Sequence, residues 1–240
     1  MFKKLSLLFL LAFFIISINS CDNISKDAAD SNSGGEEQAD NNDEKSNTIK
    51  PNALPTLDKS LEMVSTFDEF DHIVEYSRRK KDFAKQGLYR LSSKQGKLLE
   101  IATYENDTLH GNRILFYAET GDTQIIESYN RGKFEGEYRV FYPNGNLEQL
   151  GVYTANIMEG TWTRFYETGE PMEEVVFVDN NENGPFKEYY QNGHLKAEGY
   201  YKDGDNEHGA LKMYDEEGEL IKTMNCVKGI CKTIWKKENK

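Results

Sequence analysis

The fold is decided by the stretch Gly136–Gly160, GEYRVFYPNGNLEQLGVYTANIMEG, because the residues that follow it repeat its pattern. From Gly160 the chain reads GTWTRFYETGEPMEEVVFVDNNENG, with glycines and aromatic residues in the same places and different polar residues between them. Such segments begin, at intervals of 24 or 25 residues, at Gly87, Gly111, Gly136, Gly160, Gly184 and Gly209. A fixed period in this range predicts an array of identical supersecondary units.

Each unit has the pattern of a β-hairpin. A second glycine follows the first after nine or ten residues, and eight residues later stand Tyr104, Tyr129, Tyr153, Phe177, Tyr201 and Cys226. An aromatic strand such as EYRVFY therefore leads into a turn such as Pro143-Asn144-Gly145, and a return strand ends on the aromatic residue. Asn-Gly favours a hairpin because both residues tolerate the positive φ of a type I′ turn. The pattern predicts strands rather than helices.

Three of these segments carry a family resemblance: FYPNGNLEQLGVY, FYETGEPMEEVVF and YYQNGHLKAEGYYKDG. They resemble the bacterial variant of the MORN repeat (membrane occupation and recognition nexus), over residues 87 to about 228. The resemblance implies an all-β fold of tandem antiparallel hairpins in one elongated, twisted sheet. A single hairpin is marginal in water, so several must stack to bury a continuous face.

The N-terminus has the features of an export signal. Lys3 and Lys4 precede the apolar run Leu5–Ile18, which is too short to span a bilayer comfortably. The run ends in Ile-Asn-Ser-Cys, which resembles the lipobox of bacterial lipoproteins. We expect residues 1–20 to be a signal peptide and Cys21 to carry lipid. The alternatives are an ordinary secretory signal with a chance cysteine, or an uncleaved anchor.

The segment 21–50 is expected to be a disordered acidic tether. Residues 22–50 hold eight acidic and three basic side chains and no aromatic one, so they cannot bury enough apolar surface to fold. The formal charge of −12 becomes −14 without the two signal lysines, and the tether's −5 leaves −9 for residues 51–240. Nucleic acid and anionic lipid are poor partners for such a surface, whereas a basic protein, a cation or a neutral glycan suits it.

Residues 51–86 should form an N-terminal cap on the repeat domain, which spans 87–240. Thr66-Phe67-Asp68-Glu69 resembles a helix capping box, and the apolar residues after it have helical spacing. HIVEYSRRKK, at 72–81, also resembles IIESYNRGK at 125–133, the return strand of a unit. We expect a short helix running into a truncated first unit.

Cys226 and Cys231 are expected to form a disulfide that closes the last hairpin. Cys226 replaces the return-strand aromatic residue, and Cys231 follows Gly229 by the same two positions that separate Tyr138 from Gly136. Cysteines on facing strands can bridge, and an exported domain keeps its disulfides. The alternative is a pair of buried free thiols.

The sequence contains no recognisable catalytic constellation. None of its four histidines lies in a metal or nucleophile motif, so we expect a protein that is not an enzyme, without cofactor or metal. The loop 179–184 opens like a calcium loop, but Tyr190 stands where the bidentate glutamate belongs. This loop and its equivalent at 203–207 are open to two interpretations, weak calcium binding or turn chemistry.

Two aromatic ladders are the candidate partner-binding residues. Because strand side chains alternate, one ladder lies on each face of the sheet. The first comprises Phe116, Phe141, Phe165 and Tyr189, and the second Tyr117, Tyr142, Tyr166 and Tyr190. In a single-layer sheet at least one ladder should be partly exposed. The alternative is that both ladders serve cross-strand packing alone.

These features predict a monomeric, lipid-anchored envelope protein at the outer membrane or cell surface, whose repeat sheet binds an unidentified protein partner. The chain also resembles the YwqK-like antitoxin family, and an acidic surface suits a basic toxin. The export signal departs from a cytoplasmic antitoxin and favours an envelope immunity role. The alternative is a non-enzymatic lipoprotein that binds a membrane surface or a glycan, or acts as a spacer.

Overall fold

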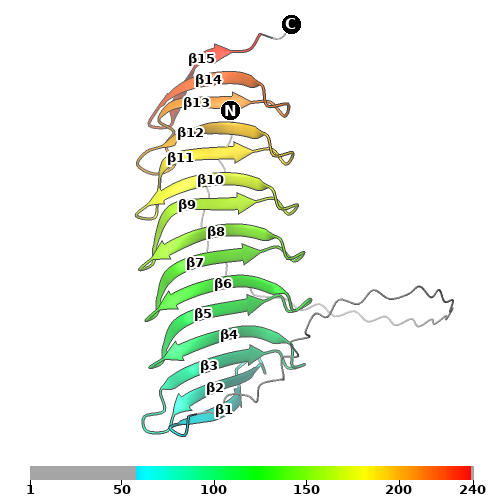
Figure 1. The fold of residues 1–240 in the computed structure, drawn as a ribbon, viewed down its shortest axis with the longest axis vertical. Coiled ribbons are helices and arrows are strands. Elements are labelled where there is room, and N and C mark those ends of the chain that lie inside the picture. The colour runs from blue at the N-terminus through cyan, green and yellow to red at the C-terminus, as the bar shows by residue number, and fades with distance from the viewer. Residues whose placement is uncertain (1–57, 239–240) are drawn as a thin grey trace, which may run out of the picture. The chain divides into compact units, whose positions relative to one another are not determined.

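The computed structural model describes residues 58–238, so the expected signal peptide, Cys21 and the tether lie outside the described residues. Fifteen strands form one sheet in chain order, and each is antiparallel to its neighbours (Figure 1). They are β1 (Leu61–Phe67), β2 (Ile73–Arg79), β3 (Lys85–Ser92), β4 (Leu98–Glu105), β5 (Thr108–Phe116), β6 (Thr123–Asn130), β7 (Lys133–Phe141), β8 (Leu147–Thr154), β9 (Ile157–Phe165), β10 (Pro171–Val178), β11 (Asn181–Tyr189), β12 (Leu195–Tyr201), β13 (Gly209–Tyr214), β14 (Leu220–Val227) and β15 (Ile230–Lys236). The prediction of an all-β sheet of tandem hairpins is confirmed.

The turns inside the units differ from the predicted type I′. In the unit β7–β8 the N–H of Gly145 bonds the carbonyl of Tyr142 at 2.9 Å, and of the turn residues 143–145 only Gly145 has positive φ (85°). This is a type I turn followed by a left-handed glycine, the usual three-residue hairpin loop. Asn144 instead serves the next unit, donating its amide to Glu167 O at 2.9 Å.

Type I′ turns occur between the units. Both central residues have positive φ at Asn106-Asp107, Ala155-Asn156 and Asp179-Asn180. Two-residue turns of this type match the twist of the strands they join. The asparagine or aspartate also ties neighbouring units together, because Asn156 Oδ1 accepts the N–H of Phe134 at 2.7 Å and Asn180 Oδ1 that of Met158 at 2.8 Å.

The expected N-terminal helix is wrong, and strands β1 and β2 take its place. The carboxylate of Asp68 accepts the backbone N–H groups of Phe70 and His72, each at 2.9 Å, and so closes a hairpin turn. Asp68, a residue of the predicted capping box, therefore stabilises a turn. Its carboxylate oxygens can accept hydrogen bonds from the backbone N–H groups of a turn as readily as from those of a helix N-terminus. The resemblance of residues 72–81 to a return strand was the better guide, since β2 pairs with β3 along its length.

One face of the sheet, here called the core face, carries the buried side chains. Rings from successive units contact one another along it: Phe134 stacks on Tyr153 at 5.0 Å, and Tyr153 meets the edge of Trp162 at 5.0 Å. The buried cluster continues toward the C-terminus through Met158, Trp162, Val175, Phe177, Phe186, Ala197, Leu211 and Cys226. Within residues 58–238 the sheet has a single layer, so the described cover of this face is its own large side chains and their contacts along the array.

A charged cluster replaces the aromatic residue in the unit β5–β6. Arg113 stands where Tyr138 and Trp162 stand in later units, and its guanidinium bonds both oxygens of Glu100, at 2.8 and 3.0 Å, and Glu127 at 3.1 Å. Glu100 and Glu127 are 9% and 7% exposed. The hydrogen bonds to Glu100 hold the pKa of Arg113 above its usual value. The cluster is a buried ion network inside an aromatic face.

Cys226 and Cys231 lie opposite each other on β14 and β15. Their sulfur atoms are 2.03 Å apart, so a disulfide joins the last two strands. Cys226 is buried in the core cluster, at 1% exposed.

Candidate binding surface

The face opposite the core face, here called the open face, is covered by no other element of residues 58–238. A continuous row of paired residues crosses it from strand to strand: Arg90, Ile101, Ile114, Ile126, Arg139, Leu150, Thr163, Glu174, Lys187, Glu198 and Lys212. The isoleucines are half-buried, and nearby Leu88 and Val152 are exposed. The row is therefore apolar over β4–β6, where the three isoleucines lie side by side, and mostly charged over β10–β13.

The first predicted ladder lies on this open face. Phe141 pairs with Leu147, Phe165 with Pro171, and Tyr189 with Leu195, and all four ladder residues, Phe116 included, are half-buried. Each ring therefore packs on an aliphatic neighbour across the hairpin and keeps part of its surface accessible. The ladder extends the apolar area of the open face along the turn side of the sheet.

The second predicted ladder lies on the core face and is tied to the backbone. The hydroxyl of Tyr117 donates to Phe141 O at 2.7 Å, that of Tyr142 to Phe165 O at 2.8 Å, that of Tyr166 to Tyr189 O at 2.7 Å, and that of Tyr190 to Tyr214 O at 2.9 Å. Each ring thus reaches from its own unit to the next. The sequence placed the two ladders on opposite faces correctly, but it gave no sign of these bonds.

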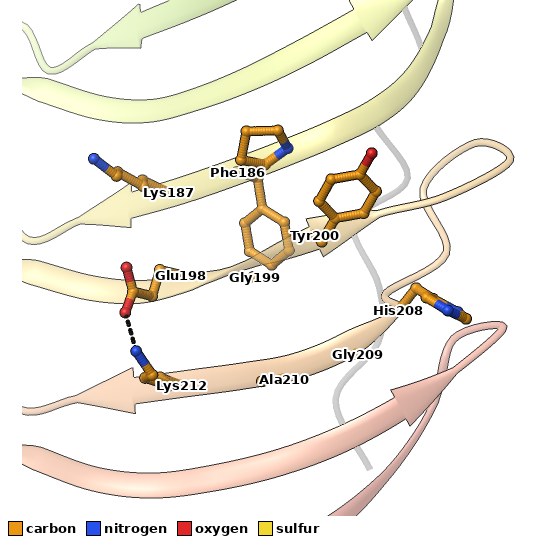
Figure 2. Close-up of a pocket in the computed structure, with 10 residues that line it drawn as sticks. Phe186, Lys187, Glu198, Gly199, Tyr200, His208, Gly209, Ala210 and Lys212 are labelled. Atoms are coloured by element: carbon orange, nitrogen blue, oxygen red, sulfur yellow. Dashed lines mark hydrogen bonds and ion pairs between the residues drawn. The ribbon is translucent and has the colours of Figure 1, made fainter.

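A shallow groove of about 420 Å³ lies on the sheet at β11–β13 (Figure 2). Lys187, Glu198 and Lys212 line one end, where Lys212 bonds Glu198 at 2.8 Å, and Tyr200 and His208 line the other. The groove occurs where residues 202–208 join β12 to β13, a longer link than the two-residue turns of β4–β5 or β8–β9. Sequence reasoning missed it, although the extra residue between Tyr201 and Gly209 was a signal.

The acidic loops take part in turns between units. The side-chain oxygen of Asn180, the second residue of the calcium-like loop, accepts a hydrogen bond from the N–H of Met158. The side-chain amide of Asn206 donates to Asp203 O at 3.0 Å. Within residues 58–238, no group of three or more His, Cys, Asp or Glu side chains is placed to hold a metal ion. The geometry therefore favours the turn interpretation of these loops.

The surface is suited to contact with a large ligand. Its groove is shallow, its aromatic side chains are spread over many strands, and several of its charged side chains form ion pairs with one another. Two of the histidines serve turns, since His72 bonds Asp68 and His194 Nδ1 lies 2.6 Å from Glu216 O. The part of the chain that the structure describes contains no helix able to span a membrane.

Comparison with known proteins supports the repeat assignment. A family model described as the MORN repeat variant matches three tandem stretches, residues 134–155, 158–179 and 182–203. These stretches begin at β7, β9 and β11 and each covers one strand pair. The units on either side share the strand pattern but depart in residue type, with Arg113 before the matched region and Cys226 after it. No curated protein matches the chain.

Proposed function

We propose that this protein is a lipid-anchored, non-enzymatic binding protein of the cell envelope, whose open face holds a protein partner. The observation that carries the proposal is the apolar row of Ile101, Ile114 and Ile126, aligned across strands with no described element over it. A contiguous apolar area on one face marks an interaction site more often than single exposed residues do. MORN repeats in general suggest a binding role.

The anchor part of the proposal rests on the sequence alone. The lipobox-like Ile18–Cys21 would place an acyl group at the N-terminus, and the acidic stretch 22–50 would let the sheet stand away from the membrane. Loss of membrane fractionation and of fatty-acid labelling in a Cys21→Ser variant tests it. A variant that stayed membrane-bound would favour an uncleaved anchor.

The charge of the domain favours a partner with a basic rim. Residues 51–240 carry −9, and electrostatic complementarity speeds and orients association more than it adds affinity. A basic toxin acting in the envelope would fit, which is why an immunity role related to the YwqK-like antitoxins is the specific form of the proposal. Co-expression with the product of an adjacent gene, with and without rescue of growth, tests that form.

The experiment for the binding surface is a crosslinking pull-down from envelope extract with the full chain as bait. Ile114→Asp together with Ile126→Asp should lose the partner, because two charges would enter the apolar area. Glu174→Gln, in the charged half of the same row, is the matched control and should keep it. A partner retained by the double variant would move the site off the open face.

A protein with no partner in either experiment would favour the spacer or membrane-surface alternatives. Flotation of the Cys21→Ser chain with liposomes separates these two, because only a membrane-binding sheet would float. The negative domain charge predicts no flotation with anionic vesicles.

A further inference from the structure

We propose that the core face carries a second binding site, for a linear β-1,4-linked glycan, along the tyrosine band. The tyrosine band is the row Tyr117, Tyr142, Tyr166 and Tyr190. It lies on the face opposite the apolar row, so the proposal goes beyond the protein-binding function and does not depend on it.

The band presents aromatic rings that are already fixed in place. Each hydroxyl is held by a backbone carbonyl of the next unit, at 2.7 to 2.9 Å, while each ring remains half-buried rather than buried. A ring anchored at both ends loses little conformational freedom when a ligand stacks on it. Sugar rings present C–H groups on their flat faces, and these pack on aromatic rings.

The spacing of the band fits a polymer with a two-sugar repeat. One tyrosine occurs per unit and each unit has two strands, so successive rings are offset by roughly 9.6 Å, twice the spacing of neighbouring strands. In a β-1,4-linked glycan alternate sugars face the same way, and the repeat of two sugars has about the same length. An α-1,4-linked glycan coils and cannot keep step with rings repeated at this spacing.

Polar side chains on the core face lie beside the band. Arg164 and Glu173 form an ion pair at 3.9 Å and Lys196 and Glu188 one at 2.8 Å. Glu148 and burial together raise the pKa of Tyr117 and of Tyr142, with burial the larger cause, so this carboxylate lies near both rings. Such groups offer donors and acceptors to sugar hydroxyls.

The charge of this strip selects among polymers. Two basic side chains, Arg164 and Lys196, stand against three acidic ones, Glu148, Glu173 and Glu188. A polyanion would lie against carboxylates along its whole length, and the two basic side chains would not offset their repulsion. A neutral glycan meets hydrogen-bonding groups of both kinds and no net repulsion.

The test is isothermal titration of the full chain with chitohexaose, a neutral β-1,4-linked hexasaccharide long enough to span roughly three intervals of the band. Binding should strengthen with each added pair of sugars, and maltohexaose, the α-1,4-linked control, should not bind. Absence of chitohexaose binding, or equal binding of both sugars, would overturn the proposal. These two outcomes decide it without any variant.

Variants then locate the site. Tyr142→Phe with Tyr166→Phe keeps both rings but removes the bonds that anchor them, and should weaken binding by less than about tenfold in all, whereas alanine at both positions should weaken binding by about tenfold per ring. A folded alanine variant that binds like the parent would place the glycan elsewhere. Ile114→Asp with Ile126→Asp must leave glycan binding unchanged, so failure of the protein-binding proposal is distinguishable from failure of this one.

Discussion

The indole ring of Trp162 lies directly over Gly151, so close that a methyl group on Gly151 would come within 2.1 Å of ring atom Cδ2. Gly199 has the same relationship to Phe186 in the next unit but one, at 2.7 Å. Neither glycine has positive φ, so what these positions require is space rather than backbone freedom. The return strand uses a glycine where the large core residue of a neighbouring strand needs room.

Gly151→Ala should therefore destabilise the sheet by about 3 kcal/mol, because the new methyl group would overlap the indole of Trp162, which is 4% exposed. The measurement is the midpoint of urea unfolding. Val152→Ala, one residue along on the open face, is the control and should change stability by less than about 1 kcal/mol. An unchanged midpoint for Gly151→Ala would mean that the indole can leave its position at little cost.

Arg113→Ala should cost about 3 kcal/mol, because it leaves the carboxylates of Glu100 and Glu127 buried without their counter-ion. Arg139→Ala removes an exposed guanidinium that pairs with Glu137, and should cost less than about 1 kcal/mol. Thermal unfolding of the two variants side by side makes the comparison. Equal losses would show that the buried network contributes no more than a surface pair.

Tyr142→Phe should cost about 1 kcal/mol, the net value of the hydrogen bond that its hydroxyl gives to Phe165 O. Tyr200→Phe is the matched control, since this tyrosine is 43% exposed on the open face. Chemical denaturation of both variants tests the difference. A silent Tyr142→Phe would show that water replaces the carbonyl without loss.

Stability should fall between about pH 10 and about pH 12. Burial raises the pKa of Tyr89 and of Tyr138 to about 12, with nearby glutamates adding to the effect. A group whose folded-state pKa is raised contributes stability that is complete below its unfolded pKa, about 10 for tyrosine, and is lost as the pH passes through the folded value. The free energy of unfolding and the tyrosinate absorbance, measured over the same pH range, should change together. Complete ionisation of the tyrosines at pH 10 in a chain that is still folded would contradict this prediction.

Reduction of Cys226–Cys231 should loosen the last hairpin alone. The bridge closes a short segment, so it should contribute no more than about 2 kcal/mol, and its strands contact only their chain neighbours. Hydrogen exchange by mass spectrometry should rise in β14 and β15 and stay constant in β7–β11. A rise throughout would mean that the end hairpin holds the whole array.

The period and the faces of the sheet were predictable, because glycine and aromatic positions recur at one offset and side chains alternate along a strand. What failed was local. Asp68 satisfies turn amides instead of starting a helix, and Asn144 has no positive φ because a three-residue loop places only Gly145 there. Residue type alone does not distinguish these outcomes, since the same oxygens and the same turn residues serve both.

The features of the surface were predictable only in part. Arg113 could have been noticed as a charge in an aromatic position, with Glu127 directly opposite it on the return strand of the same unit. The hydroxyl bonds of the tyrosine band could not, because they depend on how far a ring reaches across the next hairpin. The groove at Tyr200 and His208 arises from one additional residue between Tyr201 and Gly209. The spacing of the repeat shows this insertion but does not predict the groove.

Within the described sheet, every strand pairs only with the strands before and after it in the chain. The bonds that Tyr117, Tyr166, Asn156 and Asn180 make between units follow the same rule, each reaching 22 to 24 residues along the chain. Mechanical force applied to the two ends of such a sheet meets one hairpin at a time. The array would unfold from its ends, one hairpin after another, with a similar extension at each step. It would therefore lengthen gradually under load, whereas a closed domain would unfold in a single event.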